Sequence, residues 1–274
     1  DATTLKFGRQ RLIYDNARFI GNVGWRQNEQ TYDGFSLSNS SLSHTTLNYA
    51  YVYNVNRIFG EDSPNGDLDT RAHFVNLAYD GFASARLVGY GYFLDLQDAP
   101  AASNKTLGVR LTGAPAVVSG LSLSYALEYA RQSDYADGAN IGADYWLGEL
   151  GLKRGGWQLT GGYELLGADD SAFSTPLATG HAFNGWADKF LATPADGLED
   201  RYLRLDGSLA DFKLSARYHD FSADRGSADY GSEVDLQAAR SFGDVTLLAK
   251  YASYNADDFA TDTDKFWLMA QVAF

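Results

Sequence analysis

Apolar and polar residues alternate with a period of two along many short stretches of the chain. In the stretch TLNYAYVYNVN, Leu47, Tyr49 and Tyr51 fall on one face, whereas Asn48 and Asn54 fall on the other. Strict alternation over about eight to ten residues indicates a β-strand with one apolar and one polar face. The pattern recurs and predicts fourteen strands, at residues 4–14, 31–40, 45–56, 71–81, 85–96, 105–114, 120–131, 143–153, 156–166, 200–209, 211–221, 232–241, 244–254 and 264–274.

The connections between these strands are alternately short and long. The longest, residues 168–199, is rich in aromatic as well as polar side chains, and all five prolines lie between strands. A soluble antiparallel sandwich would also alternate, but its apolar face would be the buried one. Short turns at one end of the strands and long loops at the other are typical of outer-membrane barrels.

Aromatic residues near the ends of the apolar faces favour the barrel, because such barrels carry aromatic girdles at both membrane interfaces. These residues are Tyr90, Tyr129, Trp146, Trp157, Tyr251 and Phe266. We therefore predict an all-β protein with a single domain over residues 1–274, a transmembrane antiparallel up-and-down β-barrel of about fourteen strands in the outer membrane. Its surroundings would be outer-membrane lipid and lipopolysaccharide.

The last strand, KFWLMAQVAF, places Phe266 and Phe274 on its apolar face and ends on an aromatic residue. It resembles the C-terminal signal of bacterial outer-membrane proteins, which the barrel-assembly machinery recognises. We expect Phe266 and Phe274 to form that signal.

Composition excludes several other classes of protein. The chain has no cysteine, so disulfides and cysteine-based catalysis or metal binding are excluded. Its net charge of −13 argues against nucleic-acid binding, which normally requires a basic excess. No zinc signature, P-loop or G-x-S-x-G motif is present, and we expect no metal or cofactor. Of four histidines, only His73 and His219 fall on predicted strands, and neither has an evident nucleophile beside it, so we expect no enzyme.

Strand parity assigns charged side chains to the lumen. The inward basic residues are Lys6, Arg110, Lys153, Arg204, Lys213, Arg217, Lys250 and Lys265, and an opposing acidic wall comprises Asp80, Asp95, Glu128, Glu149 and Glu164. Opposed walls of this kind would produce a transverse field that selects charged solutes. The lumen charge is nearly balanced, so much of the negative charge lies in the loops.

The alternation fails in FGRQRLIYDNARFIGNVGWR, residues 7–26, which hold Arg9, Arg11, Arg18 and Arg26. Arg9 and Arg11 share the parity of Phe7, and an arginine facing lipid at mid-depth would cost roughly 2–4 kcal/mol. A bulge near Gly8 would turn them inward. We expect residues 15–30 to fold into the pore, so that these arginines narrow it; the loop at 168–199 either plugs the barrel or caps its rim.

The segments LKFGRQRLIYDNARFIGNVGWRQNEQTYDGFSL and HAFNGWADKFLATPADGLED resemble the alginate-export porin family of Gram-negative outer membranes. The resemblance implies a monomeric barrel with an arginine-rich constriction that passes anionic or polar solutes, in some members a uronate polysaccharide. It assigns the constriction to Arg9, Arg11, Arg18 and Arg26. Members of that family carry several strands before the G-R-Q segment, so the resemblance also implies further N-terminal strands.

The sequence leaves four functions open. The leading one is a porin for passive diffusion of small polar or anionic solutes through an arginine-lined constriction. The others are export of an acidic polysaccharide such as alginate, a plugged structural or adhesive barrel, and an outer-membrane hydrolase.

Overall fold

The computed structural model describes residues 2–118 and 120–272. Fourteen antiparallel strands follow one another in chain order within one sheet, as predicted. They are β1 (Thr3–Gln10), β2 (Thr31–Asn39), β3 (Thr45–Asn56), β4 (Asp67–Phe82), β5 (Ala85–Leu94), β6 (Asn104–Gly113), β8 (Leu121–Asp134), β9 (Asp144–Arg154), β10 (Trp157–Leu166), β13 (Leu198–Leu209), β14 (Phe212–Ser222), β15 (Asp229–Phe242), β16 (Val245–Ala256) and β17 (Thr263–Val272). The remaining elements are β7 (Ala116–Val118), which pairs with β8, the hairpin β11 (Ala168–Asp169) and β12 (Ser171–Ala172), and two short 3-10 helices, η1 (Pro100–Ala102) and η2 (Gly180–Ala182).

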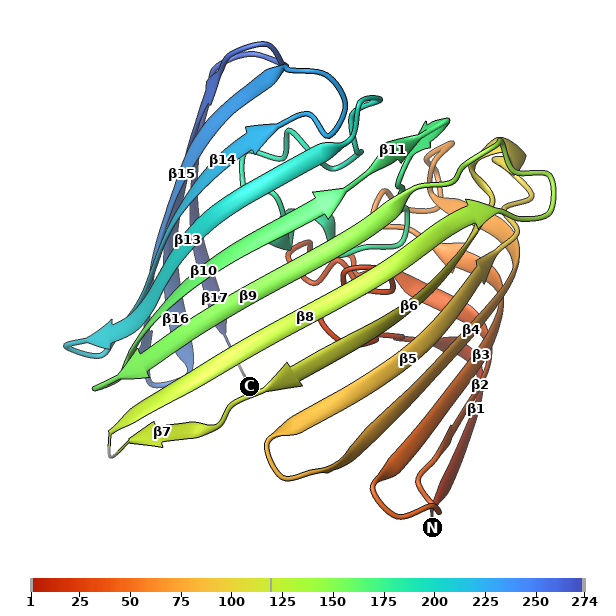
Figure 1. Ribbon diagram of the computed structural model, residues 1–274, viewed down its shortest axis with the longest axis horizontal. Coiled ribbons are helices and arrows are strands. Elements are labelled where there is room, and N and C mark those ends of the chain that lie inside the picture. The colour runs from red at the N-terminus through yellow and green to blue at the C-terminus, as the bar shows by residue number, and fades with distance from the viewer. Residues whose placement is uncertain (1, 119, 273–274) are drawn as a thin grey trace.

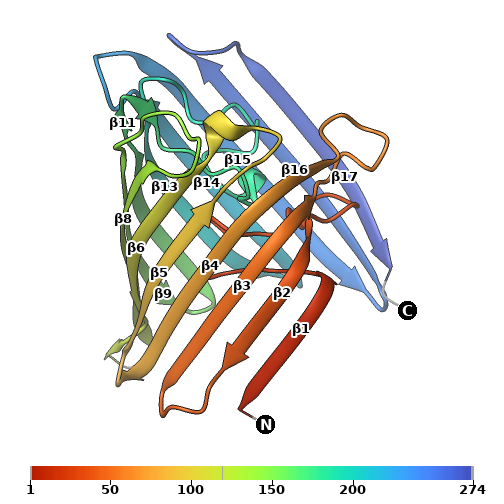
Figure 2. The ribbon, with the colours of Figure 1, turned by 90° about the vertical axis from the view of Figure 1, so that its right-hand side faces the viewer.

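The sheet curls around a central space, with the short turns at one end and the long loops at the other (Figure 1). Figure 2 shows β1 and β17 as the two edges of the curled sheet. Each of these strands pairs with one neighbour, and no hydrogen-bonded ladder joins them among the described residues. None of the helices in the described part of the chain is long and apolar enough to cross a membrane.

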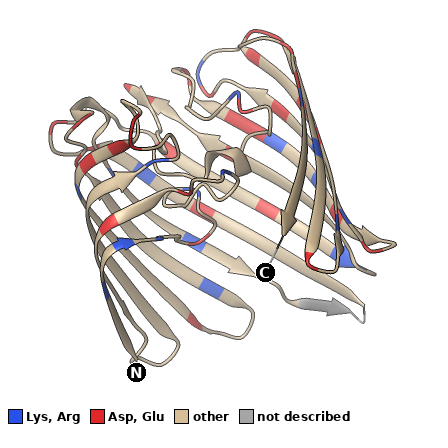
Figure 3. Ribbon diagram, turned by 180° about the vertical axis from the view of Figure 1, so that it is seen from behind, with Lys and Arg blue, Asp and Glu red and all other residues tan. Residues whose placement is uncertain are grey.

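The two faces of the sheet are inverted relative to those of a soluble protein. Large apolar side chains are exposed on the outside, for example Phe266 at 67% and Leu268 at 76%. The inner face buries polar and charged side chains such as Glu128, Glu164 and Lys250. Figure 3 shows that Lys, Arg, Asp and Glu occur both along the strands and in the loops at the rim of the curled sheet. A continuous exposed apolar surface on the outside of a curled sheet, with polar and charged side chains buried on its inside, suits lipid rather than water, which excludes the sandwich.

Two strand boundaries differ from the prediction for a structural reason. β1 ends at Gln10 rather than at residue 14, because the chain leaves the wall there and enters the lumen. β4 begins at Asp67 rather than at residue 71, because its first residues continue the ladder with the end of β3 beyond a register shift near Val52. The edge strand β1 is therefore shorter than predicted, and β4, three strands further along the sheet, is longer.

Candidate functional site

The first inward segment, residues 11–30, packs against the inner face of the sheet. Its Tyr14 ring stacks on Tyr92 of β5 at 6.1 Å between centroids, and Phe19 lies edge-on to Tyr145 of β9 at 5.1 Å. Positive φ angles at Asp15 (52°) and Ala17 (64°) form the turn that brings these rings inward. The segment therefore fills part of the lumen between walls that lie far apart in the sequence.

The second inward segment, residues 173–197, joins the first by backbone hydrogen bonds. The N–H of Gly21 donates to the carbonyl of Leu177 at 2.9 Å, and the N–H of Thr179 donates to the carbonyl of Ala17 at 3.0 Å. Because backbone groups bond at both points, the two segments form one layer across the lumen. We call residues 11–30 and 173–197 the constriction layer.

Arg18 fixes this layer to the sheet. Its Nε donates to Glu164 of β10 at 2.8 Å, its guanidinium donates to the amide oxygen of Asn184 at 2.9 Å, and it stacks on Phe183 at 4.7 Å. Glu164 also accepts hydrogen bonds from Tyr145 at 2.7 Å and from Asn184 at 2.6 Å. Three partners thus satisfy one buried carboxylate, which is the condition for a stable buried charge.

A second attachment lies near the edge formed by β16 and β17. The Lys250 ammonium lies 3.6 Å from the ring centroid of Trp186, 4.3 Å from Trp25 and 5.7 Å from Trp267. Trp25 and Trp186 belong to the two segments of the constriction layer and Trp267 belongs to β17. Cation–π contacts from one lysine to three indoles hold the layer against this wall. We call Lys250 with these three rings the tryptophan cage.

His181 extends the cage. Its Nε2 lies 2.7 Å from Lys250 Nζ and its Nδ1 lies 2.6 Å from Asp188. Burial lowers the pKa of His181, and the Lys250 charge lowers it further against the opposing effect of Asp188. Burial alone would raise the pKa of Asp188, but the contacts with His181 and Lys265 bring it below its usual value. A neutral His181 satisfies both neighbours, because its Nδ1–H donates to the Asp188 carboxylate and its Nε2 accepts from the Lys250 ammonium.

Two acidic residues of β15 hold the backbone of the same segment. Glu233 accepts from the N–H of Ala187 at 2.6 Å, and Asp235 accepts from the N–H of Trp186 at 3.2 Å. Both carboxylates are almost fully buried. They fix the position of Trp186, whose ring stacks against the guanidinium of Arg217 in the cavity described next.

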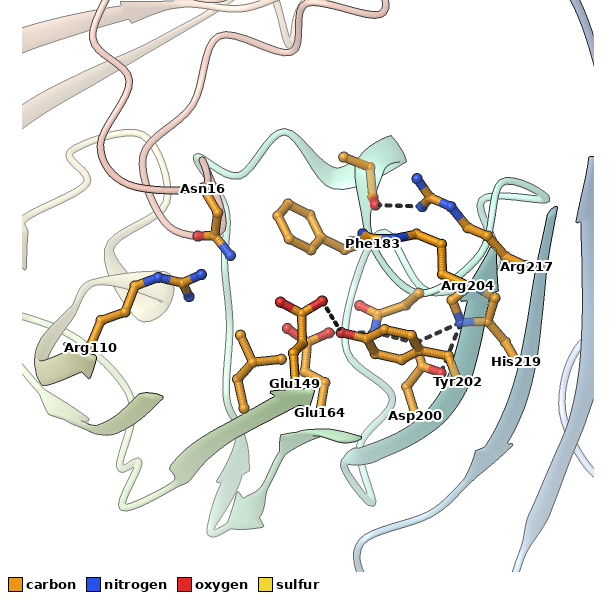
Figure 4. A pocket seen from close by; sticks show the side chains of 13 residues that line it. Asn16, Arg110, Glu149, Glu164, Phe183, Asp200, Tyr202, Arg204, Arg217 and His219 are labelled. Carbon is orange, nitrogen blue, oxygen red and sulfur yellow. Dashed lines mark hydrogen bonds and ion pairs between the residues drawn. The ribbon is translucent and has the colours of Figure 1, made fainter. Parts of the chain in front are cut away.

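The layer leaves a cavity of about 280 Å³ beside it, lined by both acidic and basic side chains. Figure 4 shows Arg110 on one side and Arg204 and Arg217 on the other, with Glu149 and Glu164 between them. Asp200, Tyr202, His219 and the amide of Asn16 complete its polar lining. A cavity of this size is slightly smaller than the usual range for small-molecule sites.

Arg204 and Arg217 lie directly opposite each other on β13 and β14. Like charges at such positions repel each other. Arg204 is within 2.9 Å of Asp206, whereas no carboxylate of the described residues lies within 4.0 Å of Arg217. The Arg217 guanidinium instead stacks on Trp186 at 4.6 Å and donates weakly to the carbonyl of Ala182 at 3.4 Å. Asp235 lies opposite Arg217 on β15, but its carboxylate accepts from the N–H of Trp186, so the Arg217 guanidinium has no ion-pair partner within 4.0 Å in the described part of the chain and can bind an anionic group in the cavity.

The four arginines of residues 7–26 do not converge on the cavity. Of these four arginines, Arg18 alone is buried, and it lies in the constriction layer. Arg11 pairs with Glu29, and Arg26 lies 3.8 Å from Asp188; both are largely exposed. The inward placement of Arg9 was wrong: it lies opposite Asp33, pairs with it at 2.9 Å and is 55% exposed.

The register explains why Arg9 stays on the outer side. β1 pairs with β2 without interruption from Thr3 to Gln10, so Arg9 keeps the parity of Phe7, and the residue opposite it, Asp33, keeps the parity of Phe35. Gly8 does adopt a positive φ of 102°, but the register shift lies between Asp33 and Gly34 on the other side of β2. Arg9 is tolerated because Asp33 and the end of the strand provide a polar environment.

The predicted acidic wall is interleaved with arginines. Asp80 pairs with Arg86 at 3.2 Å, Glu128 pairs with Arg110, and Glu164 pairs with Arg18. Glu149 accepts a hydrogen bond from Tyr202 at 2.9 Å.

Asp95 does not belong to the wall: it follows β5 with the parity of Phe93, whereas Leu94 and Leu96 are buried inside. Tyr90, predicted for the lipid face, is likewise buried inside, against Phe19.

The other predicted lumen residues lie outside the main cavity. Lys6 lines a separate cavity of about 330 Å³ with Gln10 and Ser36. Lys265 lies 3.3 Å from Asp188, and Lys213 is exposed near the turn before β14. Phe266 faces outward, whereas Phe274 lies outside the described residues.

Several residues of the site were not recognised from the sequence. His219 has a carboxylate partner that the sequence did not reveal, because Asp200 lies 2.9 Å from its Nδ1. Asn184 and the tryptophan cage were also missed, although the aromatic content of the 168–199 loop was a signal for the cage. No group of residues suited to a metal ion is found in the described part of the chain.

Comparisons with known proteins support a porin fold. No protein-family model matches the sequence, and no curated protein matches it significantly. Among solved structures, Pseudomonas aeruginosa OccK9 (OpdG) aligns with a TM-score of 0.76 and 18% identity, covering 98% of this chain and 72% of that one. Acinetobacter baumannii OccAB2 aligns with a TM-score of 0.74 and 17% identity, covering 98% and 75%.

Pseudomonas aeruginosa OccD3 (OpdP) aligns with a TM-score of 0.71 and 15% identity, over 98% of this chain and 73% of that one. These neighbours are outer-membrane porins, so the curled sheet has the fold of a porin barrel. They give no support to the alginate-export family that the sequence resembles.

Proposed function

We propose that the protein is an outer-membrane channel for passive diffusion of small polar or anionic solutes. One observation carries this proposal: the free guanidinium of Arg217 faces Arg204 in a cavity that lies where two inward segments narrow the lumen. The outer face of the sheet is apolar, which suits a membrane wall. The porin fold of the structural neighbours supports the same function.

The selecting residues are then Arg204 and Arg217 rather than Arg9, Arg11 and Arg26, since Arg110 is paired with the buried Glu128. Arg18 supports the constriction from within and is screened by Glu164. Glu149 and Asp200 line the same cavity, so a solute with an anionic group and hydrogen-bond donors fits better than a simple anion.

The other functions are less well supported. Export of an acidic polysaccharide requires a wide, basic pore, whereas two segments cross this lumen and its arginines alternate with carboxylates. A hydrolase requires a nucleophile beside its base, and among the described residues His219 bonds only to Asp200. Assembly through the C-terminal strand and contact with lipopolysaccharide are further parts of the proposal, consistent with the outward Phe266.

Single-channel recording in planar bilayers tests the channel directly. We expect discrete conductance steps and a preference for anions that falls in the Arg204→Gln/Arg217→Gln double variant. Arg201→Gln is the matched control, because Arg201 lies on the outer face of the same strand and pairs with Glu199. Absence of conductance would overturn the channel. Unchanged selectivity in the double variant would overturn the role of the two arginines.

A further inference from the structure

The outer surface of β10 and β13–β17 carries an apolar groove of about 470 Å³. Its walls and floor include Trp157, Leu205, Leu236, Ala238, Ala249 and Tyr251. Ala238 and Ala249 face each other across β15 and β16, so two short side chains form a depression between larger neighbours. The depression faces the same side as the exposed Leu205 and Leu236.

One arginine lies on this outer face beside the groove. Arg240 follows Ala238 by two residues on β15, which places it on the same face about 7 Å further along the strand. Its guanidinium lies 4.9 Å from the ring centroid of Phe242 and 5.1 Å from that of Phe212. The residue opposite it on β16 is the outward Leu247, which confirms the direction of its side chain.

The partners of Arg240 within the protein do not satisfy it. Asp211 is 83% exposed and reaches the guanidinium at 3.4 Å, while the Arg240 Nε has no hydrogen-bond partner in the described residues. An exposed pair of this kind contributes little. The Nε hydrogen is buried, so the terminal Nη hydrogens that do not point at Asp211 are the ones left to bind another acceptor.

The location of Arg240 identifies that acceptor. It lies next to the short turns at residues 210–211 and 243–244, and short turns of such barrels face the periplasm. At this height the headgroups of the periplasmic leaflet meet the barrel, and arginine binds phosphate through a planar fork of donors. The aromatic rings keep the guanidinium at the interface instead of letting it extend into water.

We propose that this surface binds one phospholipid of the periplasmic leaflet, with its phosphate at Arg240 and an acyl chain in the groove over Ala238 and Ala249. The inference rests on the membrane location in the proposed function, but not on conduction. Charge complementarity at Arg240 and its position two residues beyond Ala238, which lines the groove, select a phospholipid over a protein partner.

Native mass spectrometry of the full chain in non-ionic detergent, titrated with phosphatidylglycerol, tests the site. We expect one lipid to remain bound to the unmodified protein under conditions that strip the others. Arg240→Gln should weaken its binding by about tenfold, since a charge-assisted contact to phosphate is lost. Ala238→Phe should have a similar effect by filling the groove.

Arg201→Gln is the matched control, because Arg201 also lies on the outer face over an aromatic ring, Tyr163, but at the opposite end of the sheet and away from the groove. Equal lipid retention by the unmodified protein and the three variants would mean that the lipid binds non-specifically, and this result would overturn the proposal. Displacement by soluble glycerophosphate would show a simple phosphate site and would also overturn it.

The readouts keep this proposal separate from the proposed function. Conductance of Arg240→Gln should match that of the unmodified protein, because Arg240 lies outside the lumen. A protein that fails to conduct but retains one lipid would overturn the channel and leave the lipid site in place. Heat-modifiable migration on gels verifies that each variant is folded.

Discussion

Arg18 and Glu164 are 146 residues apart in the chain and form an ion pair 2.8 Å long, in which each side chain is 3% exposed. One residue belongs to the first inward segment and the other to β10. The pair therefore connects the constriction layer to a wall of the sheet, where Asn184 of the second segment joins both.

Arg18→Met should destabilise the protein by about 3–5 kcal/mol, because it leaves Glu164 buried with an uncompensated charge. Equilibrium unfolding in detergent measures this loss. The double variant Arg18→Met/Glu164→Leu should recover part of it, since no charge then remains buried.

The surface pair Arg9–Asp33 gives the control. Arg9→Gln should leave the unfolding free energy close to that of the unmodified protein, because solvent screens that pair. If Arg18→Met lowered the free energy of unfolding as little as Arg9→Gln, the buried pair would not hold the constriction layer against the sheet.

Lys250 offers a second prediction. Lys250→Met preserves the length of the side chain but removes the charge that contacts three indoles. We expect Trp25 and Trp186 to become more accessible, so acrylamide should quench tryptophan fluorescence more strongly. Open-channel noise should also rise as the layer loosens.

Lys213→Met is the comparison for Lys250→Met, because Lys213 also faces the lumen but is exposed and contacts no tryptophan among the described residues. Equal quenching in the two variants would contradict the role of the tryptophan cage.

The strands could be predicted because each depends on a local pattern. Period-two alternation identified all fourteen, and it failed mainly where the lumen contains protein instead of water. Tyr90 was assigned to lipid because it is aromatic, but it faces inward onto Phe19 of the constriction layer. An apolar residue does not reveal which side is lipid when an inward segment makes part of the lumen apolar.

The site could be predicted only in part for a related reason. Parity correctly placed Arg110, Arg204 and Arg217 on the same face as Glu149, but it could not show which charges would be neutralised. The pairing of Arg18 with Glu164 depends on how a segment crosses the lumen, and no spacing in the sequence encodes that path. The register at β1 likewise placed Arg9 beside Asp33, and only the paired strand reveals this.

The His181 contacts predict a dependence on pH. Burial lowers the pKa of His181 in the folded protein, so its contribution to stability is fully present above the unfolded value of about 6.5 and is lost as the pH falls from there toward the folded pKa. A protonated His181 would no longer accept from Lys250 and would repel it, with Arg26 adding to the repulsion. Asp188 stays ionised in this range because its own pKa is lowered.

Hydrogen exchange of residues 180–188, corrected for intrinsic rates, should therefore increase between about pH 7.5 and pH 5.5. His181→Gln removes the titration while it keeps a donor and an acceptor, so exchange in that variant should change less with pH. An equal pH dependence in both proteins would assign the effect to other groups, of which Glu233 and Asp235 lie against the same segment.

Gly185 should tolerate alanine poorly, and a second glycine shows why. Gly185 and Gly226 have similar positive φ angles of 83° and 87°, so alanine strains both backbones alike. A Cβ at Gly185 would also collide with the Glu233 carboxylate that holds the N–H of Ala187, whereas a Cβ at Gly226 meets nothing within 4 Å. Gly185→Ala should therefore lower the free energy of unfolding in detergent by at least about 1 kcal/mol more than Gly226→Ala does.

Of the two substitutions, Gly185→Ala alone should raise open-channel noise, because displacing Glu233 releases the backbone that positions Trp186 and Arg217. Equal costs for the two substitutions would show that Glu233 yields without loss, and that the attachment of this segment rests on Lys250 and Arg18.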